Sequence, residues 1–215
     1  MNPSPRLAKV HSAATKRIRR LRVLVDGLSL PSTTPEDRLV AWVVIEMVNL
    51  WANFLRSYYL SCSIETRTGS GVTLTFTSVT FIDVQAALRH SVVLLRDPKF
   101  AKPVVSRRDE PAWHDSRKFL ILAKNVGISN LTQVYRAFGY KTAFFEFLIP
   151  VRNFYAHRCD ETHRKASNVG VKMGLAATPR LRATEIMCAA LPHRPHNLIT
   201  DWLDDMRNVI DLLCA

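Results

Sequence analysis

Apolar residues recur at three- and four-residue spacing along most of this 215-residue chain. That spacing is the period of an amphipathic α-helix, so it favours helices over strands almost throughout. Between about 36 and 62, apolar residues occupy more than one side of the expected helix, which predicts a helix in the middle of a bundle. The other helices are expected at 5–28, 82–95, 113–125, 130–138, 142–164 and 196–213. We therefore predict an all-α bundle of six or seven helices.

Three segments break the helical pattern. Residues 66–80 contain Thr-Gly-Ser-Gly followed by alternating apolar residues and threonines, which predicts a short hairpin or extended insertion. Residues 97–111 form a loop rich in proline and charge, and residues 166–195 show no clear period. The length is that of one domain, so we expect a single domain over 1–215, with a basic N-terminal helix, a core at 36–164 and a C-terminal helix.

The chain is strongly basic, because 30 Lys and Arg stand against 18 Asp and Glu, a net charge of +12. This charge favours a polyanionic partner, either RNA, DNA or an anionic membrane surface. The most apolar segments, 39–55 and 143–151, are interrupted by Glu46 and Glu146 and are too short to span a bilayer. The N-terminus lacks the apolar core of a secretory signal, and the four cysteines are widely spaced. We expect a cytoplasmic protein without a membrane partner.

Several kinds of catalytic site lack their sequence signatures. Gly69-Ser70-Gly71 has neither the lysine nor the third glycine of a nucleotide-binding loop, and no Gly-x-Ser-x-Gly or His-Glu-x-x-His occurs. A zinc site is conceivable from two groups of residues, but their spacing matches no familiar zinc signature. These are His157, Cys159 and His163, with Cys188, His193 and His196. We expect neither a metal nor a cofactor.

The densest group of chemically capable side chains follows an apolar run. Arg152, Asn153, His157 and Arg158 fall within seven residues. On a helix, Asn153 and His157 share a face, and Arg152 lies about 140° round from His157, a gap that its long side chain partly bridges. If Pro150 begins or kinks the helix, the free N–H groups after it help to seat a phosphate. An imidazole that is neutral near pH 7 can accept a proton, as a general base must.

The segment Arg152-Asn153-Phe154-Tyr155-Ala156-His157 resembles the Arg-x(4 to 6)-His signature of the HEPN superfamily (higher eukaryotes and prokaryotes nucleotide-binding domain). In that superfamily the motif lies on a helix of an all-α bundle, and a polar residue often follows the arginine. The apolar lead-in at 144–151 and the earlier apolar helix bearing Glu46 and Asn49 are similar to the superfamily in pattern, loosely over 36–164. The resemblance implies a HEPN-like bundle.

The resemblance also implies a metal-independent endoribonuclease, in which a ribose 2′-hydroxyl attacks the adjacent phosphodiester and leaves a cyclic phosphate and a 5′-hydroxyl. His157 would be the general acid or base, Arg152 would neutralise charge on the phosphorane, and Asn153 would orient His157 or the phosphate. Such nucleases pair two motifs, and this chain holds one Arg-Asn-x-x-x-His, so the resemblance implies a homodimer with a composite site. It further implies a toxin or phage-defence effector, with an antitoxin or defence protein as partner.

Further residues are candidates for supporting roles. Glu46 and Asn49 either complete the site from an adjacent helix or are polar residues satisfied locally, and Arg158 adds a second guanidinium. The RNA path would be lined by Lys16, Arg19, Arg20, Arg107 and Arg108. Cys159 stands where HEPN toxins paired with a nucleotidyltransferase antitoxin carry a modified tyrosine, so that form of regulation is not expected.

Two other interpretations of the motif stay open. Arg152 can be a structural residue bonded to Glu146 or Asp160, with His157 bonded to a backbone carbonyl. The chain would then be a non-catalytic HEPN-like domain that binds RNA or nucleotide, or a dimeric interaction subunit. The tryptophans are expected in the core rather than as stacking platforms for bases. They are Trp42, Trp51, Trp113 and Trp202.

Overall fold

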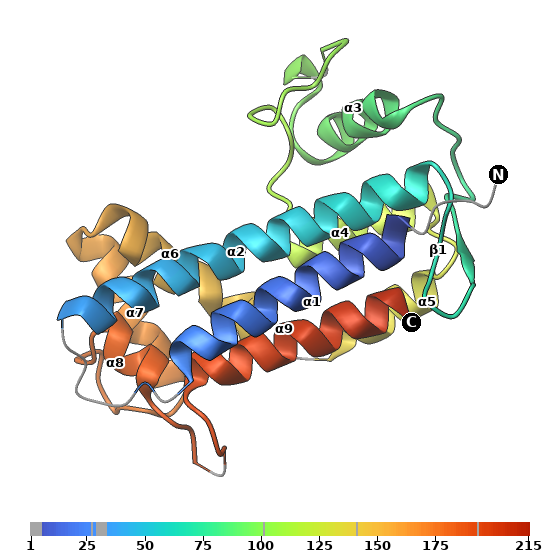
Figure 1. Cartoon of the computed structure of the whole chain (residues 1–215). Coiled ribbons are helices and arrows are strands. Elements are labelled where there is room, and N and C mark those ends of the chain that lie inside the picture. Colours follow the sequence, from blue (N-terminus) through green and yellow to red (C-terminus); the bar gives the residue numbers. More distant parts are fainter. Residues whose placement is uncertain (1–5, 27, 29–33, 101, 141, 193) are drawn as a thin grey trace. The chain divides into compact units, whose positions relative to one another are not determined.

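The computed structural model describes residues 6–26, 28, 34–100, 102–140, 142–192 and 194–215 (Figure 1). Within these residues the chain forms nine α-helices, one short 3-10 helix and one two-stranded sheet, which confirms the all-α prediction. The elements are α1 (Arg6–Val25), α2 (Thr34–Ser63), β1 (Thr66–Arg67), β2 (Thr73–Leu74), α3 (Val84–Leu95), η1 (Pro98–Phe100), α4 (Ser116–Val126), α5 (Leu131–Gly139), α6 (Phe144–His157), α7 (Asp160–Lys172), α8 (Ala183–Cys188) and α9 (Leu198–Cys214).

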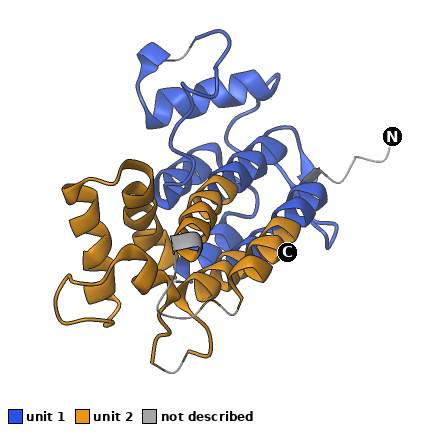
Figure 2. Ribbon diagram, turned by 60° about the vertical axis from the view of Figure 1, so that its left-hand side comes forward, with its two compact units in different colours: residues 1–14, 51–140, 209–215 blue, residues 15–50, 141–208 orange. Residues whose placement is uncertain are grey.

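The chain divides into two compact units (Figure 2). Unit 1 contains residues 1–14, 51–140 and 209–215, and unit 2 contains residues 15–50 and 141–208. The long helices α1, α2 and α9 each contribute residues to both units. The single domain expected over 1–215 came from the chain length, which carries no information on how the contacts divide the chain.

Unit 1 contains the expected hairpin and a core of aromatic side chains. β1 and β2 are antiparallel, with Thr66 opposite Leu74, so the short hairpin is confirmed. Tyr58 and Tyr59 of α2 are fully buried, and their rings lie 6.1 and 5.4 Å from those of Phe119 and Trp113. The C-terminus of α4 is capped by Gly127 with φ of 61°, the left-handed conformation that glycine adopts at no steric cost.

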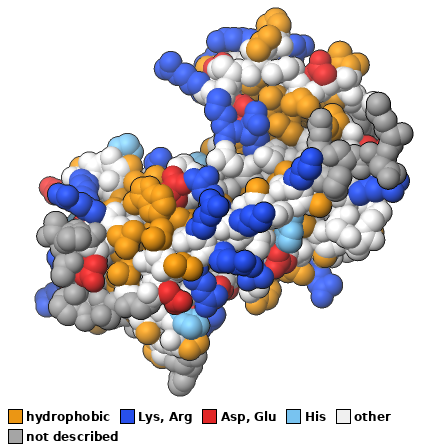
Figure 3. All heavy atoms as spheres, in the orientation of Figure 1, with side chains coloured by type: hydrophobic (Ala, Val, Ile, Leu, Met, Phe, Trp, Pro, Cys, Tyr) orange, Lys and Arg blue, Asp and Glu red, His pale blue; other side chains and the backbone are white. Residues whose placement is uncertain are grey.

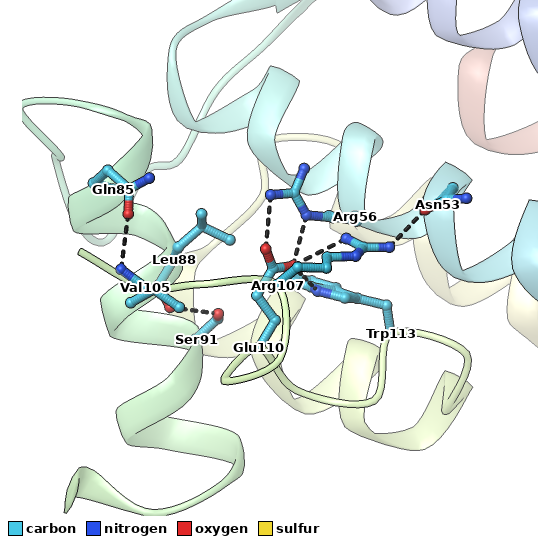
Figure 4. A network of polar contacts seen from close by, with 9 residues as sticks. All are labelled: Asn53, Arg56, Gln85, Leu88, Ser91, Val105, Arg107, Glu110 and Trp113. Carbon is cyan, nitrogen blue, oxygen red and sulfur yellow. Dashed lines mark hydrogen bonds and ion pairs between the residues drawn. The ribbon is translucent and has the colours of Figure 1, made fainter. Parts of the chain in front are cut away.

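A buried carboxylate organises the long loop of unit 1 (Figure 4). The Glu110 side chain is 2% exposed and accepts two hydrogen bonds from the Arg56 guanidinium, at 2.6 and 2.7 Å. Arg107 Nη1 and Trp113 Nε1 donate to Glu110 Oε2 at 3.1 and 2.7 Å. Arg107 Nη2 also donates to Asn53 Oδ1 at 2.5 Å. The loop is therefore fixed onto α2 by charge-assisted hydrogen bonds.

Unit 2 contains two helices where the sequence predicted one over 142–164. α6 ends at His157, Arg158 adopts the left-handed conformation with φ of 43°, and α7 begins at Asp160. The prediction of one continuous helix was wrong, because the spacing of apolar residues does not reveal a single residue with positive φ. Asp160 and Glu161 lie in the first turn of α7, where negative charge is stabilised by the positive end of the helix dipole. These two acids therefore favour the start of a new helix after the break. The segment without clear period contains the end of α7 and all of α8.

The helix α2 is apolar enough to resemble a membrane span. Among the described residues, Glu36–Ser63 is the one stretch with the length and hydropathy to cross a bilayer, and 56% of its most apolar window is buried in the fold. A core helix of a soluble protein has the same character, so α2 gives no clear signal of a membrane protein.

Candidate active site

The candidate motif lies on the last two turns of α6. Phe144, Leu148, Val151 and Tyr155 recur at helical spacing and are buried, so they form the side of α6 that packs into unit 2. The polar residues of the motif fall beside this buried stripe. Consequently, Arg152 and Asn153 are half-buried at its edge, and His157 is exposed at the end of the helix.

The side chains of the motif are only partly engaged within the chain. Arg152 Nη1 donates to Asn153 Oδ1 at 3.2 Å, whereas Arg152 Nε is buried without a hydrogen-bond acceptor. His157 makes no hydrogen bond or ion pair with any residue in the described part of the chain. An imidazole open to water is what proton transfer to or from an incoming phosphodiester requires, and the half-buried Arg152 lies on the same helical segment.

The structure does not show the internal pairing that would make Arg152 purely structural. Its hydrogen bond goes to Asn153 and not to Glu146 or Asp160. Glu146 instead lies 3.3 Å from Lys172 Nζ on α7. Within the described residues, no carboxylate pairs with Arg152, so its charge is available to a ligand.

Pro150 does not have the role that the sequence suggested as a helix start. α6 begins at Phe144, and Pro150 is its seventh residue. The free N–H groups of the α6 N-terminus therefore lie about two turns before Arg152, and they cannot seat a phosphate at the motif. The motif instead lies where α6 ends and α7 begins.

A cluster that sequence reasoning missed holds the end of α6 in place. The Tyr155 hydroxyl lies 2.8 Å from Thr184 Oγ1 on α8, and Thr184 Oγ1 donates to Asp37 Oδ1 on α2. Arg158 Nη2 lies 3.6 Å from Asp37 Oδ2, so part of its charge is compensated. Burial raises the pKa of the Tyr155 phenol, which keeps its hydroxyl protonated as a donor. The position of Tyr155 in the apolar stripe was the sequence signal for its burial.

The auxiliary candidates Glu46 and Asn49 interact with each other and with α1. Asn49 Nδ2 donates to Glu46 Oε1 at 3.1 Å, and Glu46 forms an ion pair with Arg17. In the described residues, none of their hydrogen bonds or ion pairs reaches α6. Of the two interpretations left open, these contacts favour polar residues satisfied by each other and by α1 over residues that complete the site.

The candidate RNA-path residues fall into different environments. Lys16, Arg19 and Arg20 are exposed on the part of α1 that belongs to unit 2. In unit 1, Arg107 is bonded to Glu110 and Asn53, as described above, whereas the Arg108 side chain is exposed. The positive charge of Arg107 is thus already matched by a buried carboxylate.

Cys159 is the exposed cysteine of the four, all of which lie in described segments and are free thiols. The hydroxyl of Thr162, and then its backbone N–H, lower the pKa of the Cys159 thiol. Burial raises the pKa of the others, to about 11 for Cys188 and about 12 for Cys214, and raises that of Cys62 as well. A thiol with a lowered pKa is more ionised at a given pH and reacts faster.

We therefore expect iodoacetamide at pH 7 to 8 to alkylate Cys159 at least about tenfold faster than the other cysteines of the folded chain. Peptide mass spectrometry over a time course measures the four rates. Thr162→Val should slow the reaction at Cys159, because the hydroxyl that stabilises the thiolate is removed. Equal labelling of Cys188 or Cys214 in the native protein would contradict this prediction.

No group of three or more His, Cys, Asp or Glu side chains is placed to hold a metal ion in the segments that the structure describes. His193, one member of the zinc set considered from the sequence, lies outside those segments. Comparison with protein-family models, with curated proteins and with solved structures finds no match for this chain.

Proposed function

We propose that the chain is a metal-independent endoribonuclease of the HEPN type, in which Arg152, Asn153 and His157 act on the RNA backbone. The observation that carries the proposal is the state of His157, which is exposed and unpartnered in the described chain. It stands on the same helical segment as the half-buried Arg152 guanidinium, with which no carboxylate of the described residues pairs. The net charge of +12 supports a polyanionic substrate.

The reaction needs two proton transfers and no cofactor. One imidazole removes the proton of a ribose 2′-hydroxyl, and the oxygen attacks the adjacent phosphorus. The bond from phosphorus to the 5′-oxygen breaks, and a protonated imidazole supplies the proton to that leaving oxygen. Arg152 stabilises the negative charge on the phosphorane, and Asn153 holds Arg152 through the hydrogen bond at 3.2 Å.

A second copy of the chain would supply the second imidazole. Each chain contains one Arg-Asn-x-x-x-His segment, so a homodimer in which two such segments face one RNA provides one base and one acid. The proposed setting is the cytoplasm, where the enzyme acts as a toxin or defence effector restrained by a partner protein. The second candidate function is a non-catalytic RNA-binding domain, which the exposed cations Lys16, Arg19 and Arg20 favour.

The proposal is tested by incubating the purified chain with single-stranded RNA, and with DNA of the same sequence, in the presence of EDTA. We expect cleavage of the RNA and none of the DNA, because DNA lacks the attacking 2′-hydroxyl. Binding of RNA without cleavage would favour the non-catalytic candidate. Cleavage of both polymers, or loss of cleavage in EDTA, would contradict the proposed chemistry.

A further inference from the structure

Trp42 lies on the surface of α2, with 48% of the residue exposed. The other three tryptophans, Trp51, Trp113 and Trp202, are only 2%, 5% and 1% exposed. The prediction that all four lie in the core is therefore wrong for Trp42. Its helix position explains the exposure, because Trp42 lies about 40° from Glu46 on the outer side of α2, away from the buried residues Val43 and Met47.

An ion pair sets the register between Trp42 and the basic helix α1. Arg17 of α1 pairs with Glu46 of α2, and in unit 2 the two helices lie side by side and run in opposite directions (Figure 1). Trp42 precedes Glu46 by about one turn, and Arg20 follows Arg17 by about one turn. Because the helices are antiparallel, the turn from Glu46 back to Trp42 and the turn from Arg17 on to Arg20 lead in the same direction. Helix geometry therefore places Arg20 opposite Trp42.

The residues around Trp42 form a surface that is both basic and apolar. Arg38 lies one turn before Trp42 on the same side of α2, and Leu24, which is 43% exposed, lies one turn after Arg20 on α1. We call the surface of Lys16, Arg20, Leu24, Arg38 and Trp42 the Trp42 face. Figure 3 shows Lys and Arg side chains gathered along α1 and hydrophobic side chains exposed beside them.

The cations of the Trp42 face are not used within the fold. Lys16, Arg20 and Arg38 make no ion pair with any residue that the structure describes. Two acids of α2 are already compensated, since Glu46 is paired with Arg17 and Asp37 with Arg158. The face thus combines free positive charge with an exposed indole ring.

We propose that the Trp42 face binds single-stranded nucleic acid, with one base stacked on the Trp42 indole and the flanking phosphates held by Arg20, Arg38 and Lys16. Aromatic platforms bordered by cations are the usual means of holding a single strand without reading its sequence. The Trp42 face shares no residue with the Arg152 and His157 motif, so this binding does not depend on the proposed cleavage. The free cations favour this occupant over an uncharged protein surface.

In the test, the full chain is titrated with an oligo(dT) of about ten nucleotides, a length within the site sizes of single-strand binding folds. Oligo(dT) has no 2′-hydroxyl, so the proposed reaction cannot cleave it. Trp42 is the exposed tryptophan, so we expect stacking to quench and shift the intrinsic fluorescence. Trp42→Leu should lose the quenching and weaken binding, measured by anisotropy of labelled oligo(dT), about tenfold or more. Trp42→Phe should recover part of the affinity. Each of Arg20→Gln and Arg38→Gln should reduce the slope of log affinity against log salt by about 0.7.

Matched controls come from α5, where Tyr135 is 45% exposed and Arg136 is also exposed. Tyr135→Leu and Arg136→Gln should leave the affinity unchanged. Equal affinity of Trp42→Leu and the wild type would overturn the proposal, provided that thermal unfolding followed by circular dichroism shows both folded. So would quenching that depends on protein concentration alone, which indicates a second copy on this face, or quenching by anionic vesicles but not by oligo(dT).

Discussion

Replacing His157 with alanine is expected to lower the rate of RNA cleavage by about 10²- to 10⁴-fold, the usual contribution of a general acid or base. The fold should be unaffected, because His157 is exposed and makes no hydrogen bond or ion pair in the described chain. Single-turnover cleavage of an end-labelled RNA in EDTA measures the rate. The affinity for uncleavable DNA of the same sequence should change by less than about twofold.

Arg152→Ala should reduce the same rate by about 10²- to 10³-fold, since it removes a donor to the charged phosphorane. Arg152→Lys keeps the charge but not the planar guanidinium, and should recover only part of the activity. The matched controls are His163→Ala and Arg164→Ala, both exposed on α7. If a control variant loses as much activity as His157→Ala, the motif has no special role.

The second large effect is expected in stability and not in activity. Glu110→Gln should lower the free energy of unfolding by about 3 kcal/mol, because it leaves the Arg56 and Arg107 guanidinium groups without their buried carboxylate. We take the lower end of the range for a broken buried ion pair, since the Arg56 side chain is 28% exposed and keeps some contact with water. Urea unfolding followed by circular dichroism gives the value.

The control for this variant is Glu161→Gln, which breaks the exposed pair with Lys165 on α7. Exposed pairs contribute little, so its unfolding curve should overlay that of the wild type. Arg107→Gln should lie between the two, because the Arg107 side chain is 51% exposed and Arg56 remains bonded to Glu110. An unchanged midpoint for Glu110→Gln would show that the network is not important to the fold.

The helices were predictable because each must bury one apolar side, and that requirement places apolar residues at three- and four-residue spacing in the sequence. The apolar spacing at 142–164 located α6 and the first part of α7, but not the break between them. That break rests on one residue, Arg158, with φ of 43°, a conformation that is uncommon for residues other than glycine and that the residue type arginine does not indicate. The division into two units depends on contacts between segments distant in sequence, which periodicity does not encode.

The candidate site was predictable as a cluster, but the partners of its members were not. Arg152, Asn153 and His157 are adjacent in sequence, so the helix alone brings them together. The hydrogen bond from Thr184 to Asp37, which helps to hold the end of α6, joins residues 147 positions apart. No local sequence pattern predicts it. For Arg107 and Trp42 as well, the sequence did not show which surroundings the side chain would have. Arg107 is matched by the buried carboxylate of Glu110, whereas Trp42, expected in the core, is exposed.

The most direct measurement of the proposed chemistry uses a DNA oligonucleotide with a single ribonucleotide, incubated with the chain in EDTA beside an all-RNA oligonucleotide. Attack by a 2′-hydroxyl predicts one cut, directly after the ribonucleotide, and mass spectrometry should show a cyclic phosphate on one product and a 5′-hydroxyl on the other. His157→Ala should leave this substrate intact over the same time. An intact substrate with the wild-type chain, cuts at deoxynucleotides, or a 3′-hydroxyl on the ribonucleotide at the cut would contradict the account.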